Sequence, residues 1–197
     1  MYKVHGIPFT RTFRVLWALE EMDLPYELNP AAPQSEDARR LNVSGKVPIL
    51  EVDGAVLTDS TAILTYLADK HGKLTHPAGT LERAAQDGLT HLILDEFDSV
   101  LWTASRHSFV LPEEQRCPEI KDSLKWEFAR SLDRLAPRLE GPFLMGETMT
   151  IADIILSHCL NWAFSAKFPI QNEAALAYSK SMRARPAFQR VAALGKS

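Results

Sequence analysis

The chain has 197 residues, long enough for one large domain or two small ones with separate hydrophobic cores. Lys and Arg total 22 against 25 Asp and Glu, a formal net charge of −3, so the chain has no excess positive charge to attract nucleic acid. No apolar run approaches the roughly 20 residues that cross a bilayer, and the first residues lack the apolar stretch of a secretion signal. We therefore expect a cytoplasmic protein that binds neither nucleic acid nor membrane.

The sulfur and imidazole side chains suggest no covalent or metal scaffold. Cys117 and Cys159 are the only cysteines and form no C-x-x-C motif, which argues against a disulfide framework or a zinc site. The 6 His residues show no spacing typical of metal ligands. We expect a protein without a bound metal.

The first third of the chain alternates strand and helix signals. Tyr2–His5 is short and β-prone, and Gly6 ends it. Arg11–Met22 has the periodicity of a helix that is apolar around much of its circumference, which predicts that other elements cover it on two sides. Tyr26–Leu28 predicts a second strand. The proline-containing polar stretch from Pro30 to Asp37 predicts a mobile loop.

A hairpin and a helix follow this loop. Ile49–Val52 and Ala55–Thr58 flank Asp53-Gly54, a turn signal because both central positions of such a turn need positive φ. Asp59-Ser60 can cap a helix that Gly72 would close. The residues alone therefore give the order β-α-β, loop, β-β-α.

The rest of the chain shows only helical patterns after a linker at Leu74–Thr80. Thr150-Ile-Ala-Asp153 has the form of a capping box, which gives Asp153 a structural role and not that of a catalytic acid. We expect a first domain over 1–77 and an all-helical domain over 81–197. The amphipathic stretches are Leu81–Phe109, Glu119–Leu139, Ile151–Phe164, Glu173–Ala184 and Pro186–Leu194.

Three segments carry a family resemblance. The run Thr10-Arg-Thr-Phe-Arg-Val-Leu-Trp-Ala-Leu-Glu-Glu-Met22, with Leu24-Pro-Tyr-Glu27 after it, resembles the first helix and second strand of bacterial glutathione transferases. Asn42-Val-Ser-Gly-Lys-Val-Pro-Ile-Leu50 resembles the family segment that ends in a cis-proline, and Asp59-Ser-Thr-Ala-Ile-Leu-Thr-Tyr-Leu67 resembles its acidic-Ser helix start. All three occur in the family's order ahead of a helical half.

The resemblance implies a fold and a chemistry. It implies an α/β thioredoxin-like first domain (β-α-β-α-β-β-α) and an all-α second domain, assembled as a homodimer through the helices that start at Ser60 and Leu81. Glutathione would be the co-substrate, without a metal, and its thiolate would attack a small hydrophobic electrophile. The electrophile cannot be read from the sequence.

The same resemblance assigns residues to the tripeptide. A cis Val47–Pro48 bond would present the Val47 backbone to the cysteinyl unit, as an added strand edge does. Ser60 and the N–H groups of its helix would bind the γ-glutamyl carboxylate, Asp59 the ammonium group and Lys46 the glycyl carboxylate. The alternatives are that Pro48 only starts an edge strand, that Ser60 only caps its helix and that Lys46 is only solvated.

The enzyme must stabilise the thiolate, because a free thiol with a pKa of about 8.5 is mostly protonated at neutral pH. A hydrogen bond from a hydroxyl at the start of the first helix can do so, since that helix end is also partially positive. In the family's serine-dependent classes the hydroxyl lies four residues before the helix Arg, and counting back from Arg14 gives Thr10. Thr12 is a second hydroxyl in reach and Arg11 could add charge. The alternative is that Thr10 only caps the helix. No Cys lies in residues 1–72, which disfavours cysteine-dependent thiol transfer.

Trp102 and Arg106 are candidates for contacting the electrophile, because family architecture places parts of their helix over the thiol, although core packing would also explain the aromatic side chain. Other functions stay open. The chain could be a non-catalytic glutathione-binding or protein-interaction module on the same fold, or a specialised dehalogenase or peroxidase. An isomerase would be expected to show Ser-Ser-Cys where this chain has Phe9-Thr10-Arg11.

Overall fold

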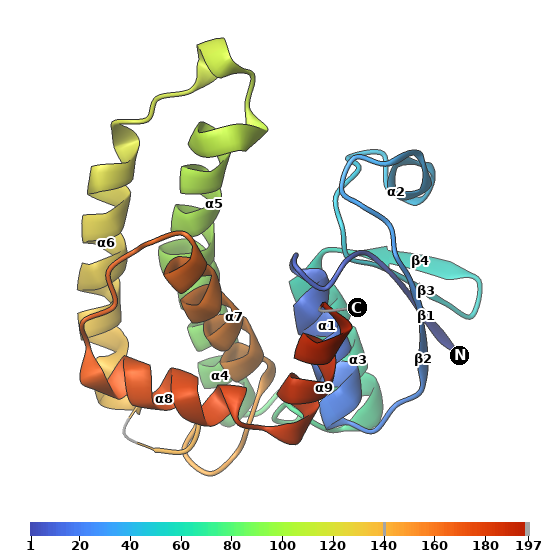
Figure 1. Cartoon of the computed structure of the whole chain (residues 1–197). Helices are drawn as coiled ribbons and strands as arrows, with labels where there is room; N and C mark the ends of the chain where they lie inside the picture. Colours follow the sequence, from blue (N-terminus) through green and yellow to red (C-terminus); the bar gives the residue numbers. More distant parts are fainter. Residues whose placement is uncertain (140, 196–197) are drawn as a thin grey trace. The chain divides into compact units, whose positions relative to one another are not determined.

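The computed structural model describes residues 1–139 and 141–195, which divide into two compact units (Figure 1). One unit is Met1–Thr80 together with the chain from Arg183 onward, and the other is Leu81–Met182. The sequence-based division into 1–77 and 81–197 stays a prediction, and its residues 196–197 lie outside the described residues. The compact units differ from that division because the last helix packs with N-terminal elements.

The first unit is built on a four-stranded sheet of order β2-β1-β3-β4. β1 pairs in parallel with β2 and antiparallel with β3, which in turn pairs antiparallel with β4. Asp53 and Gly54 have φ values of 49° and 80°, which confirms the tight hairpin turn. The sheet with its helices is the thioredoxin-like fold that the resemblance implied. The strands are β1 (Tyr2–His5), β2 (Tyr26–Asn29), β3 (Ile49–Val52) and β4 (Ala55–Thr58).

Helix α1 (Thr12–Glu21) is buried along most of its length, including every residue from Arg14 to Leu19. It packs against α3 (Ser60–His71) and against the C-terminal helix α9 (Pro186–Leu194), so the prediction of cover on two sides is confirmed (Figure 1). The ring of Phe188 in α9 lies 4.9 Å from that of Phe13 and 5.0 Å from that of Trp17, centroid to centroid.

Two arginines reinforce the α1–α9 contact. Arg185 donates through Nε and Nη2 to both carboxylate oxygens of Glu21, each at 2.7 Å, and Arg190 Nε donates to Glu20 Oε2 at 2.5 Å. The Trp17 indole also donates to Glu21, at 2.8 Å. A two-pronged Arg–carboxylate pair fixes orientation as well as adding energy. The two ends of the chain are thus joined by aromatic and ionic contacts.

One expectation about the loop before β3 is wrong. The stretch predicted to be a loop through Asp37 instead enters a short helix, α2 (Glu36–Leu41), at Glu36. Ser35 caps this helix, because its hydroxyl accepts a hydrogen bond from the Ala38 backbone N–H at 3.2 Å. The C-terminal end of helix α3 agrees with the prediction, because Gly72 ends the helix in the left-handed conformation with φ 61°.

The second unit is helical, and among its described residues the only β pairings are two isolated bridges near Phe143 and Met145. The stretch predicted as one helix over Leu81–Phe109 contains two π-helical segments, η1 (Leu94–Asp98) and η2 (Arg106–Val110). Hydrophobic periodicity does not distinguish such wide turns from an α-helix. The remaining elements are α4 (Leu81–Ile93), α5 (Ser99–Ser105), η3 (Glu113–Gln115), α6 (Ile120–Leu135), η4 (Ala136–Leu139), α7 (Ile151–Ser165) and α8 (Glu173–Arg183).

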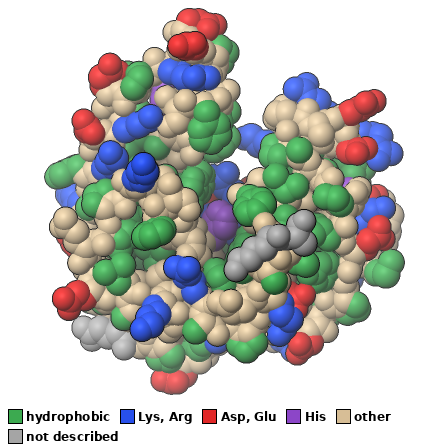
Figure 2. Space-filling model, in the orientation of Figure 1, with side chains coloured by type: hydrophobic (Ala, Val, Ile, Leu, Met, Phe, Trp, Pro, Cys, Tyr) green, Lys and Arg blue, Asp and Glu red, His purple; other side chains and the backbone are tan. Residues whose placement is uncertain are grey.

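The surface carries mixed charge. Figure 2 shows basic and acidic side chains scattered among each other on the face toward the viewer, which fits the small net charge of −3. Within residues 1–139 and 141–195, every helix is too short or too polar to cross a membrane.

The predicted capping box at the start of α7 is confirmed, and it anchors a buried network. Asp153 is fully buried, and its Oδ2 accepts from the Thr150 backbone N–H at 2.8 Å. Its Oδ1 accepts from the Leu144 N–H and from the Tyr178 hydroxyl, both at 2.8 Å. Burial raises the pKa of Asp153, although these hydrogen bonds act to lower it.

Replacing Asp153 by Asn should lower the free energy of unfolding by about 2–4 kcal/mol, because an amide nitrogen cannot accept the hydrogen bonds that one carboxylate oxygen accepts. Urea unfolding measures this. The exposed Asp122→Asn change on α6 is the matched control and should cost no more than about 0.5 kcal/mol.

Asp153 also predicts a pH dependence. Because its pKa in the folded state is raised above the unfolded-state value, its contribution to stability is complete below the unfolded value and is lost as pH rises through the folded value. The Asp153→Asn variant should lack this pH-dependent part of the free energy of unfolding. An equal loss of stability in the Asp153 and Asp122 variants would contradict the role of the network.

Candidate active site

The register of the sheet brings three chain segments to one edge. His5, the last residue of β1, lies opposite Ile49, the first of β3, and Ile49 lies opposite Thr58, the last of β4. The loop after β1, the loop before β3 and the start of α3 all leave the sheet at this edge. They carry every site residue that the sequence predicts for the first unit.

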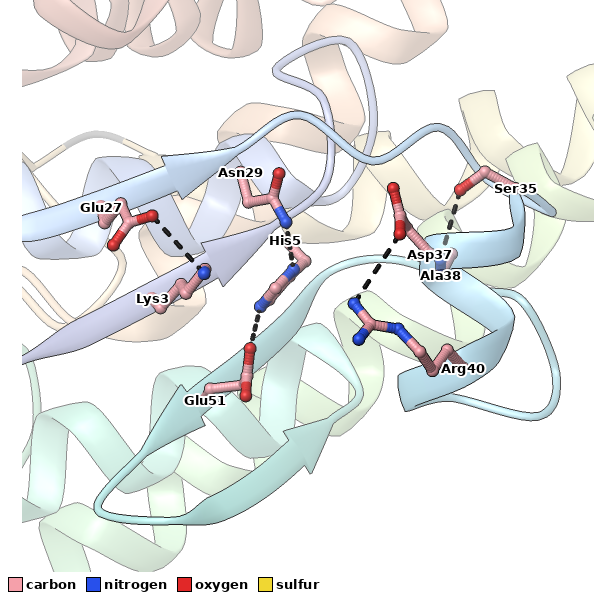
Figure 3. Close-up of polar contacts among 9 residues, drawn as sticks. All are labelled: Lys3, His5, Glu27, Asn29, Ser35, Asp37, Ala38, Arg40 and Glu51. Atoms are coloured by element: carbon pink, nitrogen blue, oxygen red, sulfur yellow. Dashed lines mark hydrogen bonds and ion pairs between the residues drawn. The ribbon is translucent and has the colours of Figure 1, made fainter.

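A polar cluster fixes the end of β1 (Figure 3). His5 is buried, and its Nε2 lies 2.5 Å from Glu51 Oε1 on β3 while its Nδ1 lies 3.0 Å from Asn29 Nδ2 on β2. The Gly6 N–H then donates to the Asn29 carbonyl at 3.1 Å. Sequence reasoning missed this role of His5, because only strand order reveals that residues of three strands meet there.

The loop before β3 is held by its own side chains. The predicted cis Val47–Pro48 bond is confirmed. Asn42 Nδ2 donates to the Lys46 carbonyl at 2.9 Å, and the Gln34 N–H donates to the Gly45 carbonyl at 2.8 Å. The backbone N–H and C=O of Val47 have no hydrogen-bond partner among the described residues. The Val47 backbone is therefore available to an extended ligand, and the exposed Lys46 precedes it.

Asp59, and not Ser60, caps helix α3, which corrects the reading of Ser60 as an N-cap. Asp59 Oδ1 accepts from the N–H groups of Thr61 at 2.9 Å and Ala62 at 3.0 Å. Asp59 has φ 71°, a left-handed value that Asp tolerates better than most residues. Neither Asp59 Oδ2 nor the Ser60 N–H has a partner among the described residues.

Ser60 also contacts helix α1. Ser60 is buried. Its hydroxyl oxygen accepts a hydrogen bond from Nη1 of the fully buried Arg14 at 3.4 Å. The contact links the starts of α1 and α3. The partial positive charge of both helix starts favours a negative group nearby.

Thr10 lies half-buried just before α1. Its hydroxyl donates to the Ile7 carbonyl at 2.9 Å and accepts from the N–H of Thr12, the first residue of α1, at 3.2 Å, although Arg11 is the N-cap residue of the helix. Thr12 is fully buried, with its Oγ1 2.9 Å from that of Thr10. Thr12 sits against Gly6, where a Cβ atom would lie 2.0 Å from Thr12 Oγ1. Thr12 therefore supports Thr10 from the interior and has no exposed surface for a ligand.

The remaining candidates are one neighbour of Thr10 and two residues of the second unit. Arg11 is half-buried beside Thr10. Trp102 and Arg106 lie in the second unit, on α5 and at the start of η2, and both are half-buried. In the part of the chain that the structure describes, no group of three or more His, Cys, Asp or Glu could hold a metal ion.

Two family models match the chain. Residues 8–70 match the glutathione S-transferase N-terminal domain, and residues 100–186 match the C-terminal domain. The glutathione S-transferase-like protein LUC7 of Fusarium sp. is 31% identical over 175 residues, which cover 80% of this chain and 75% of that protein.

Solved structures agree over the whole length. A glutathione transferase of Methylococcus capsulatus has 30% identity and a TM-score of 0.87, with all of both chains covered. A homologue from Sulfitobacter, solved with bound glutathione, has the same fold at 22% identity, a TM-score of 0.87 and coverage of 99% and 98%.

Other curated relatives match over only part of their length. This chain spans 34% of the length of glutathione S-transferase 3 from Schizosaccharomyces pombe. It spans 58% of the length of a maleylacetoacetate isomerase from Dictyostelium discoideum, with 28% identity over 62% of this chain.

The cap at α3 generates a stability prediction. Asp59→Ala should lower the free energy of unfolding by about 1–3 kcal/mol, because it removes the cap and places Ala at positive φ. Asp59→Asn should stay within about 0.5 kcal/mol of wild type, since Asn can cap and tolerates this conformation. Thermal or urea unfolding of both variants measures the difference. Equal losses would show that the carboxylate charge, and not the cap, stabilises this helix.

Proposed function

The chain belongs to the glutathione S-transferase family, a family of enzymes, and we propose that it catalyses attack of the glutathione thiolate on a small electrophile. In a substitution, a bond forms between the sulfur and a carbon of the electrophile, the bond from that carbon to a halide breaks, and the halide leaves. The thiol proton goes to solvent. We also propose a cytoplasmic location.

One observation supports glutathione binding above the others. Three unused polar groups lie at one sheet edge: the Val47 backbone, the Ser60 N–H and Asp59 Oδ2. They match the tripeptide in kind, because it has an extended backbone, a carboxylate and an ammonium group. The Val47 backbone would pair with the cysteinyl unit, Ser60 with the γ-glutamyl carboxylate and Asp59 with the ammonium. Lys46 would approach the glycyl carboxylate.

Thr10 is our choice for stabilising the thiolate. Of the two hydroxyls, that of Thr12 is fully buried, whereas Thr10 is half-buried at the start of α1. One hydroxyl carries one proton, so Thr10 must release the Ile7 carbonyl to donate to sulfur. Thr12, 2.9 Å away, can then donate to Thr10 Oγ1 in turn. Arg11 remains a possible source of positive charge. The alternative function is a module that binds glutathione without activating it.

Variants of Thr10 separate these two functions. Thr10→Val keeps the side-chain shape but removes the hydroxyl, and it should raise the pKa of bound glutathione by about 1–2, the effect of one lost hydrogen bond to a charged group. Thr10→Ser should keep the wild-type value. Thiolate absorbance of bound glutathione across a pH series measures this pKa, and turnover of an aryl halide should fall with Val but not with Ser.

A different outcome would redirect the assignment. If Val leaves both pKa and turnover unchanged, the thiolate is stabilised by Arg11 or by backbone N–H groups. If wild-type protein binds glutathione without lowering its thiol pKa, the non-catalytic alternative is correct.

We further propose a homodimer, with the start of α4 in the interface. Leu81, the first residue of α4, is 86% exposed in the single chain and lies on a helix that the family resemblance assigns to the interface. Sedimentation at micromolar concentration should give a dimer mass for wild type and a monomer mass for Leu81→Asp. Phe164→Asp on α7, where the side chain is 75% exposed, is the control and should stay dimeric. A wild-type monomer would contradict this proposal.

A further inference from the structure

Arg14 is a fully buried charged side chain that the proposed reaction does not use. It is the third residue of α1, and its Nη1 donates a hydrogen bond to the Ser60 hydroxyl oxygen at 3.4 Å. Arg keeps its charge at every pH at which proteins stay folded, and burying a charge costs free energy. An apolar side chain of similar volume can fill the same space without that cost. Packing alone therefore does not explain an Arg at this position.

The direction of this hydrogen bond determines what the Ser60 hydroxyl can do. A guanidinium carries only donors, so Ser60 Oγ is the acceptor and its single proton must point away from Arg14. No described residue accepts that proton. An oxygen that accepts from a charged donor also becomes a stronger donor itself, because hydrogen bonds in a chain polarise one another. Arg14 thus holds Ser60 as a donor whose acceptor a ligand can supply.

Ser60 offers a second donor at the same place. Its backbone N–H has no partner among the described residues, whereas the next two N–H groups of α3 donate to Asp59 Oδ1. Two donors on one residue match the two oxygens of a carboxylate, and the start of a helix favours a negative charge. Ser60 keeps 4% of its surface exposed and Arg14 none, so a ligand can touch Ser60 but not Arg14.

We propose that Arg14 is a positioning residue for glutathione, which orients the Ser60 hydroxyl so that its proton points at the γ-glutamyl carboxylate. This inference rests on the proposed function and deepens it, because that function assigns the carboxylate to Ser60 and gives Arg14 no part. Arg14 touches neither glutathione nor the electrophile. It acts only through Ser60, and both residues belong to the first unit.

Substitutions at Arg14 that differ in donors and acceptors test this role. Gln has a carbonyl oxygen, which can take the Ser60 proton away from the ligand, whereas Lys is a donor only, as Arg is. Arg14→Gln should therefore weaken glutathione binding about 10-fold or more, the effect of one lost hydrogen bond to a charged group, and Arg14→Lys should keep most of the affinity. Arg14→Met, which has no N–H donor, should also weaken binding, and it replaces the Gln variant if that variant does not fold.

A second peptide separates positioning from a general loss of structure. The peptide 4-aminobutanoyl-cysteinylglycine is glutathione without the γ-glutamyl carboxylate, and titration calorimetry gives the dissociation constant of each. Wild-type protein should bind glutathione about 10- to 100-fold more tightly than this peptide, and Arg14→Gln should lose affinity for glutathione alone. Added to Ser60→Ala, Arg14→Gln should cause no further loss, because no hydroxyl is left to orient. Arg185→Met, which removes the pair with Glu21 in the same unit, is the control and should keep the preference.

Turnover of an aryl halide then separates the two proposals. Arg14→Gln should raise KM for glutathione about 10-fold and leave kcat within about 2-fold, because Thr10 and not Ser60 is proposed to contact the thiolate. If wild type turns over the aryl halide but Arg14→Gln keeps the wild-type preference for glutathione, or its loss adds to that of Ser60→Ala, the Arg14 inference is wrong and the transferase proposal stands. If the preference depends on Arg14 but no product forms, the positioning role stands and the transferase proposal fails.

Discussion

The burial of helix α1 is the constraint on which the first unit depends. A helix that is buried from Arg14 to Leu19 cannot be covered by a sheet alone, and here α3 and α9 complete its cover. The C-terminal helix is therefore a component of the N-terminal core. Phe188 fills the space beside Phe13 and Trp17, and the Arg185–Glu21 pair fixes its direction. Helix α1, which Thr10 precedes, is thus held in part by contacts from the C-terminal helix.

The register of the sheet positions the candidate site. Because β1, β3 and β4 end at matching register positions, three segments distant in sequence meet at one edge. His5 ties β1 to its neighbours on both sides at that edge, and Gly6 leaves room for Thr12 beneath the loop. Neither residue needs to touch a ligand. They hold the end of β1 and the Thr12 side chain, whose hydroxyl lies 2.9 Å from that of Thr10, and our proposal for Thr10 requires a fixed hydroxyl.

The sequence was informative where a feature is local. The Asp53-Gly54 turn, the Gly72 helix end and the Thr150–Asp153 box each depend on a few adjacent residues, and all three were predicted correctly. Features that depend on distant residues were missed, such as the contacts of His5 and the packing of α9 with α1. The N-cap of α3 lies one residue before the Ser60 cap considered from the sequence. Asp59 and Ser60 are both good caps, and only the positive φ of Asp59 decides between them. The π turns flanking α5 leave no mark on hydrophobic periodicity.

The candidate ligand groups share one physical property. Folded proteins satisfy nearly all of their buried or constrained polar groups, so the few that stay unsatisfied call for a reason. In the first unit the Val47 backbone, the Ser60 N–H and one oxygen of Asp59 are such groups among the described residues. Side chains hold these groups in position: Asn42 donates to the Lys46 carbonyl just before Val47, and Asp59 accepts from the Thr61 and Ala62 N–H groups at the start of α3. Groups that are fixed but unpaired gain most from a ligand, because their ordering has already been achieved in folding.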